Sequence, residues 1–182
     1  MSEFTRDDEW QKEIRDRILK PWYQKHSFEG RFVFADKGKL ATKIQRELAI
    51  DTIAQIPDGF IRGVEEKIVR WPSNGRPYQN FTFETMSCTV PGHEKQGWMY
   101  YANCDTLLYC FVQEDGNSII AYSIPFDNLK KWFFENDRYT VYPITITKQI
   151  NKTECRIVPI GDVIRGVPGC KRIVIQPEFV EV

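Results

Sequence analysis

The sequence predicts an α+β or mixed α/β fold, with a mixed central sheet flanked by helices. Three observations lead to this prediction: an amphipathic helical pattern at the N-terminus, three consecutive strand-like segments in the middle, and further strand-like segments towards the end. The chain has 182 residues, which is enough to bury a core, and neither a repeat nor a low-complexity linker divides it. We therefore expect a single domain over residues 1–182.

Two helices are expected in the first third of the chain. The first covers residues 5–20, where apolar residues recur at helical spacing and acidic residues occupy the first turn. Pro21 is predicted to end this helix, because proline lacks a backbone N–H and its ring clashes with the preceding turn. The second covers residues 40–48, where apolar residues recur at every fourth position.

Strand-like segments follow the second helix. Residues 49–56 and 60–71 are expected to pair through a tight Pro-Asp-Gly turn at 57–59. Residues 81–90 read as a third strand, which ends at a Pro-Gly pair. The pattern of residues 97–102 predicts neither a helix nor a strand.

The second half of the chain is expected to be rich in β-structure. Residues 106–112 and 118–124 are predicted to form a hairpin, because both are strongly apolar and a Glu-Asp-Gly-Asn turn joins them. Pro125 opens a short helix over residues 126–134, since proline is tolerated at the start of a helix. The remaining candidates are strands at 140–147, 155–158 and 172–175 and a helical turn at 160–164.

Composition argues against several classes of protein. The 25 Lys and Arg residues balance 25 Asp and Glu residues, which argues against a strongly basic nucleic-acid-binding surface over the whole protein. The alternative is a local basic groove. No apolar run approaches the ~20 residues of a membrane-spanning helix, and the acidic, polar N-terminus does not resemble a signal peptide. We therefore expect a cytoplasmic protein with no membrane partner. Neither a P-loop nor a Gly-x-Gly-x-x-Gly fingerprint occurs, which argues against nucleotide-driven chemistry.

The chain contains five cysteines and no Cys-x-x-Cys pair. Scattered cysteines in apolar surroundings are typical of reduced thiols that behave as small hydrophobic residues. The alternative is a zinc site, but the spacing of its candidate ligands matches no common structural zinc motif. Those candidates are Cys88, His93, Cys104 and Cys110.

The most informative pattern is Asp51, followed by Glu65 fourteen residues later and by Lys67 two residues after that. Side chains at positions i and i+2 of a strand share a face, so Glu65 and Lys67 point together, and the turn brings Asp51 alongside. Two carboxylates, with the backbone carbonyl of Glu66, offer the oxygen ligands that Mg²⁺ or Mn²⁺ prefers. A lysine beside such an ion can stabilise negative charge on a phosphate. The alternative is a solvated strand face with ordinary salt bridges.

These residues resemble the motif of the PD-(D/E)xK nuclease superfamily, in which an acid, a hairpin turn and an acid-any-lysine triplet follow one another. The spacing is similar to that of archaeal Holliday-junction resolvases and many phage endonucleases. The resemblance covers about residues 38–112 and implies a restriction-endonuclease-like core over about residues 38–135, followed by a β-rich extension over about residues 139–182. The chain departs from the family pattern in that Ile50, rather than proline, precedes Asp51, and a helix after the third strand is hard to recognise.

Three further residues are candidates for the same site. In the family, the helix before the first acid often supplies an extra carboxylate or glutamine, which here implies Glu47 or Gln45 as an accessory group. If the strand 81–90 adjoins residues 60–71, Glu84 could join the cluster as a metal ligand or as a charge partner of Lys67. A glutamate paired with a base on the strand surface is an equal alternative for Glu84.

Basic and aromatic residues near the motif predict contact with nucleic acid, because bases neutralise phosphates and aromatic rings stack on unpaired bases. The candidates are Lys43, Arg70, Arg76, Lys95 and Trp98. A place in the hydrophobic core is an equally good interpretation for Trp98.

The sequence thus predicts a Mg²⁺- or Mn²⁺-dependent endonuclease that hydrolyses phosphodiester bonds in DNA rather than RNA. Asp51, Glu65 and Glu84 are the expected metal ligands, and Lys67 is the fourth expected catalytic residue. The resemblance also admits a homodimer, because junction-resolving members of the family work as dimers. The alternative is a non-catalytic nucleic-acid- or protein-binding member of the same fold, of phage or mobile-element origin, since the family includes inactivated members.

Overall fold

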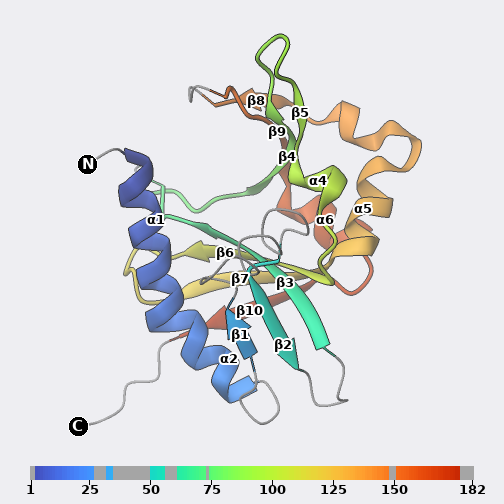
Figure 1. Cartoon of the computed structure of the whole chain (residues 1–182). Coiled ribbons are helices and arrows are strands. Elements are labelled where there is room, and N and C mark those ends of the chain that lie inside the picture. Colours follow the sequence, from blue (N-terminus) through green and yellow to red (C-terminus); the bar gives the residue numbers. More distant parts are fainter. Residues whose placement is uncertain are drawn as a thin grey trace, which may run out of the picture.

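The computed structural model describes residues 3–26, 32–34, 50–55, 61–72, 74–147 and 151–176. Within these ranges the chain forms two β-sheets with helices packed against them (Figure 1). The prediction of a mixed α/β fold is therefore confirmed. The predicted helix 40–48, with Lys43, Gln45 and Glu47, and the turn at 57–59 lie outside the described residues.

The central sheet is mixed. Its six described strands follow the order β1 (Phe32–Phe34), β2 (Thr52–Gln55), β3 (Ile61–Val69), β6 (Thr106–Val112), β7 (Ile119–Pro125) and β10 (Lys171–Ile175). β3 and β6 run parallel, whereas the other neighbouring strands run antiparallel. The two strand pairs expected from the sequence are confirmed as β2–β3 and β6–β7, although β2 is shorter than the predicted strand.

The second sheet is antiparallel, in the order β5 (Lys95–Gln96), β4 (Asn80–Cys88), β9 (Glu154–Pro159) and β8 (Ile144–Ile146). β4 is the predicted third strand, but it does not adjoin β3: it pairs with β5 and β9. The place beside β3 belongs to β6, which is buried along nearly its whole length, as suits a parallel strand inside a sheet. The condition under which Glu84 was expected to meet Lys67 within one sheet is therefore not met.

A continuous run of helix covers one face of the central sheet (Figure 1). It consists of α1 (Glu3–Ile14), a π-helical segment η1 (Arg15–Leu19) and α2 (Lys20–His26). The prediction that the helix ends at Pro21 is wrong. The N–H of Lys20 bonds the carbonyl of Arg15, five residues back, and this wider turn relieves the clash that a proline ring makes in a regular α-helix.

Alternation along the strands separates two hydrophobic cores. One face of β3 presents Val64 and Ile68 to α1 and α2. The opposite face of the sheet packs against the second sheet and against helix α5 (Phe126–Phe134), in a core rich in aromatic residues. That core includes Phe81, Phe83, Trp98, Tyr109, Phe111, Phe126, Trp132 and Phe133. Because side chains alternate along β3, Glu66 lies on the first face, and Glu65 and Lys67 lie on the second.

Several of the remaining elements follow the sequence prediction, whereas β1 and β5 were not predicted. α5 covers the predicted range, β9 and β10 match two predicted strands, and the helical turn is the start of α6 (Ile160–Gly166). The unassigned segment contains a short helix, α4 (Trp98–Tyr101). The predicted strand 140–147 is partly wrong, because a 3₁₀ segment, η3 (Glu135–Val141), occupies its start and leaves only β8. No helix in the described part of the chain is long and apolar enough to cross a membrane.

Candidate metal and phosphate site

A cavity of about 700 Å³ lies between α1, the end of β3 and the second sheet. In Figure 1, α1 stands at the left and β4 and α4 lie at the upper right, with β3 running between them. The four residues expected to be catalytic, Asp51, Glu65, Lys67 and Glu84, all line this cavity. The other lining residues are Gln11, Arg15, Glu66, Ile68, Val69, Thr82, Trp98, Tyr101, Tyr109 and Cys155.

Asp51 is held against β3 by two hydrogen bonds to the backbone of that strand. Among the described residues, β2 pairs with β3 only as far as Val64, so the part of β3 from Glu65 onwards extends past the start of β2. The N–H of Asp51 donates to the carbonyl of Val64 (2.9 Å), and Oδ2 of Asp51 accepts from the N–H of Glu66 (2.9 Å). The carboxylate of Asp51 therefore lies beside the acid-any-lysine triplet, as the sequence predicted.

Glu65 is one of two buried acids that line the cavity; like Glu66, it has 4% of its surface exposed. Burial raises the pKa of Glu65 to about 7; the Lys67 ammonium opposes this shift, and the negative charge of Asp51 adds to it. Asp51 and Glu65 thus bring two neighbouring carboxyl groups to one wall of the cavity, where they can receive a cation.

Lys67 contacts Glu65 directly and extends over the indole ring of Trp98, with Nζ 5.0 Å from the ring centroid. Burial by itself lowers the pKa of Lys67, but the Glu65 carboxylate outweighs it and raises the pKa above the usual value. Lys67 is therefore a cation at neutral pH. Its side chain keeps 32% of its surface exposed, so the ammonium group can reach a ligand in the cavity.

Glu84 enters the cavity from the second sheet. Its Oε1 accepts a 3.3 Å hydrogen bond from the N–H of Trp98, the first residue of α4. Burial raises the pKa of Glu84, while the charge of Lys67 opposes this shift. Gly97 permits the close approach of α4 to β4, since a Cβ at this position would lie 2.7 Å from Cγ of Glu84 and closer still to its carbonyl oxygen. The turn before α4 thus places both Glu84 and Trp98.

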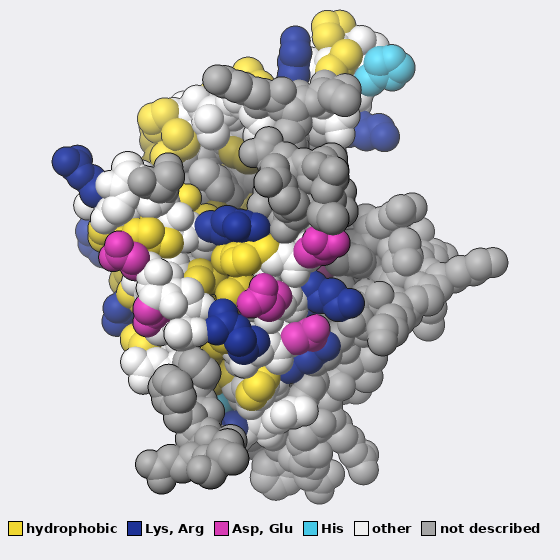
Figure 2. All heavy atoms as spheres, turned by 90° about the vertical axis from the view of Figure 1, so that its left-hand side faces the viewer, with side chains coloured by type: hydrophobic (Ala, Val, Ile, Leu, Met, Phe, Trp, Pro, Cys, Tyr) yellow, Lys and Arg dark blue, Asp and Glu magenta, His cyan; other side chains and the backbone are white. Residues whose placement is uncertain are grey.

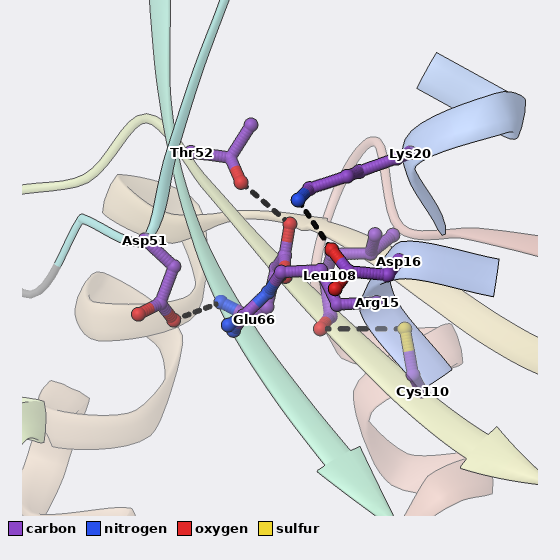
Figure 3. A network of polar contacts seen from close by, with 8 residues as sticks. All are labelled: Arg15, Asp16, Lys20, Asp51, Thr52, Glu66, Leu108 and Cys110. Carbon is purple, nitrogen blue, oxygen red and sulfur yellow. Dashed lines mark hydrogen bonds and ion pairs between the residues drawn. The ribbon is translucent and has the colours of Figure 1, made fainter. Parts of the chain in front are cut away.

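The opposite face of β3 carries a second polar network (Figure 3). Oε2 of Glu66 lies 2.7 Å from Nε of Arg15, and Oε1 accepts a 2.7 Å hydrogen bond from the hydroxyl of Thr52. The Glu66 side chain is fully buried. This network ties η1 to the strand that carries Glu65 and Lys67.

The sequence analysis missed Arg15 and Thr52. One signal for both was available, because Glu66 alternates with the apolar Val64 and Ile68, and a carboxylate on an apolar strand face needs a partner. The identity of that partner depends on how the N-terminal helical run packs, which the sequence does not reveal.

The structure describes four of the five residues expected to bind nucleic acid, and Lys43 lies outside the described ranges. Arg76 and Lys95 are exposed, and the exposed guanidinium of Arg70 stacks 4.2 Å from the ring centroid of Trp10. Trp98 is only 5% exposed and packs in the aromatic core, so its ring supports Lys67 rather than offering an open face to a base.

The donor set of the cavity fits a hard divalent ion better than zinc. Cys88, Cys104 and Cys110 are buried in the core, and neither they nor His93 line the cavity. Mg²⁺ commonly binds through one or two carboxylates and retains several waters. Asp51 and Glu65, two neighbouring carboxyl groups that line the cavity, match that requirement.

Comparison with known proteins adds no further assignment. No protein-family model matches this chain, and no curated protein is significantly similar to it in sequence.

Proposed function

We propose that this protein is a divalent-metal-dependent nuclease that hydrolyses phosphodiester bonds in DNA, with a restriction-endonuclease-like core. The observation that carries the proposal is the convergence of Asp51, Glu65 and Lys67 on one cavity at the end of β3. The resemblance to the PD-(D/E)xK motif supports it, because acid, acid and lysine are the groups that the motif requires, and they come here from adjacent antiparallel strands of a mixed sheet.

Asp51 and Glu65 would hold the Mg²⁺ or Mn²⁺ ion. When bound, such an ion polarises a phosphate and lowers the pKa of a coordinated water. The hydrogen bond from the Glu66 N–H orients Asp51 before any ligand arrives, and burial keeps bulk water away from Glu65. Both features reduce the reorganisation that binding requires.

Lys67 supplies the permanent positive charge of the site. Its contact with Glu65 and its position over Trp98 restrict the ammonium group to the wall of the cavity where the acids lie. There it can stabilise the negative charge that grows on the phosphoryl oxygens during hydrolysis. Glu84 acts as a charge partner of Lys67 from the other wall, since the Lys67 charge lowers the pKa of Glu84 against the effect of burial.

The test is cleavage of DNA in Mg²⁺ and in Mn²⁺ by four single variants. Asp51→Ala and Lys67→Ala should abolish cleavage, with circular dichroism spectra unchanged from wild type. Asp162→Ala and Lys171→Ala are matched controls, because they remove an acid and a lysine that lie outside the cavity; both should cleave at the wild-type rate. Wild-type cleavage by Asp51→Ala and Lys67→Ala would show that the proposed function is wrong.

A further inference from the structure

We infer that the cavity accepts an unpaired strand of DNA, such as a single-stranded end or flap, rather than a continuous duplex. This inference rests on the proposed function and names the form of its substrate. Three observations carry it: the depth of the acids, the aromatic side chain on one wall, and the charge of the neighbouring surface.

The reactive groups lie too deep for a duplex to reach easily. Glu65 is 4% exposed, and the cavity is walled by α1 on one side and by β4 and α4 on the other. A volume of about 700 Å³ accommodates a small-molecule or nucleotide-sized ligand. When a duplex brings a phosphate into such a space, its paired strand must enter as well. A flexible single strand can bring in a phosphate by itself.

One wall of the cavity offers a surface for an unpaired base. Tyr101, at the end of α4, lines the cavity and is 45% exposed, although most large aromatic residues nearby are buried. Stacking on an exposed aromatic ring requires the face of a base, which is hidden inside a duplex and free in a single strand. Because Tyr101 and Trp98 belong to the same helix, a base on Tyr101 would place its strand beside Lys67.

The surface over α1 is poorly suited to a duplex. Figure 2 shows basic and acidic side chains interspersed on this face rather than gathered into a block of one charge. Pairs such as Lys20 with Asp16 and Arg17 with Glu13 neutralise each other along the helix. Tight docking of duplex DNA relies on many Lys and Arg contacts to its phosphates, and the described face of α1 does not provide them.

The experiment measures binding and cleavage of three labelled DNAs that share one sequence: a single strand, a blunt duplex, and a duplex with a single-stranded arm. Binding is followed by fluorescence anisotropy in EDTA and in Ca²⁺, and cleavage by gel electrophoresis in Mn²⁺. The single strand and the arm should bind at least tenfold more tightly than the blunt duplex, and the cuts should fall in unpaired DNA.

Tyr101 provides the residue-level test. Tyr101→Ala should weaken binding of the single strand by about 5- to 150-fold, the effect of losing one stacked base, and Tyr101→Phe should retain it. Tyr78→Ala is the matched control, since Tyr78 is 41% exposed but lies outside this cavity. It should bind as wild type does.

The outcomes separate this inference from the proposed function. Equal binding or equal cleavage of duplex and single strand would overturn the inference and leave the nuclease assignment in place. Wild-type binding by Tyr101→Ala would also overturn it. If none of the three DNAs is cleaved, the proposed function fails, and the inference fails with it.

Discussion

The N–H of Glu66 donates a 2.9 Å hydrogen bond to Oδ2 of Asp51, while the carboxylate of the same Glu66 lies on the other face of β3 against Arg15 (Figure 3). One residue of the acid-any-lysine triplet therefore connects the first acid of the motif with η1, the segment that follows α1. Its backbone N–H orients Asp51, and its side chain forms a buried ion pair that takes no part in the proposed chemistry.

Removing one partner of this buried ion pair should lower the free energy of unfolding. Arg15→Met leaves the fully buried Glu66 without its cation and should lower the free energy of unfolding by about 3–5 kcal/mol. The double variant Arg15→Met/Glu66→Met should recover much of that loss, because no uncompensated charge remains. The measurement is urea unfolding. Arg165→Met is the control: its partner is Asp162 at the surface, and it should cost no more than about 1 kcal/mol. Equal losses for Arg15→Met and Arg165→Met would contradict the prediction.

Stability should depend on pH through Glu65. Burial raises the pKa of Glu65 from 4.5 to about 7, so between these values the folded protein binds more protons than the unfolded chain. The free energy of unfolding should therefore fall as the pH rises from about 4.5 to about 7, by on the order of 3 kcal/mol from this group. Glu65→Gln should remove this dependence and be more stable than wild type at pH 8. Urea unfolding of both proteins at a series of pH values in EDTA measures this dependence. If the free energy of unfolding changes with pH in the same way for wild type and Glu65→Gln, the prediction is wrong.

Divalent metal should stabilise the folded protein. Mn²⁺ at about 100 times its dissociation constant should add about 2.7 kcal/mol, which for a chain of this length raises the melting temperature by about 5–10 °C. Asp51→Asn and Glu65→Gln should lose the shift, and Asp162→Asn should keep it, because Asp162 lies outside the cavity. Differential scanning fluorimetry measures the effect. Absence of any shift at millimolar metal would favour a non-catalytic binding protein with the same fold.

Gly97 should matter for the site and not only for stability. A Cβ at position 97 would clash with the backbone of Glu84, so Gly97→Ala should displace α4 and cost about 1–3 kcal/mol while slowing DNA cleavage. Gly75→Ala is the comparison: Gly75 has a φ of +68°, open space around it and no place in the cavity lining, so alanine strains the backbone by about 1–2 kcal/mol without touching the cavity. Cleavage rates at a temperature where both variants are folded distinguish an effect on the site from an effect on stability alone. Equal rates would show that α4 does not position the site.

Local patterns in the sequence predicted a large part of the structure. The β6–β7 hairpin and α5 were expected within a residue or two of their observed bounds, because strong apolar runs, a turn and Pro125 mark them. The predicted end of the first helix at Pro21 was wrong. Whether a proline ends a helix depends on the turn before it, and here a π-helical segment accommodates the proline ring. The predicted start of the strand 140–147 was also wrong. The chain leaves α5 through Asn136 and Asp137 in left-handed conformations, and a 3₁₀ segment precedes the strand.

By itself the sequence determined that Asp51, Glu65 and Lys67 would meet. Glu65 and Lys67 lie two residues apart on one strand and therefore share a face, and the neighbouring antiparallel strand brings Asp51 beside them. Only short-range geometry is needed for this arrangement. Tertiary structure alone decided the rest of the cavity. Glu84 arrives from a second sheet, Trp98 is buried beneath Lys67, and Arg15 reaches Glu66 from η1. These contacts join segments far apart in the chain, and their geometry follows from how sheets and helices pack, which no local pattern of residues specifies.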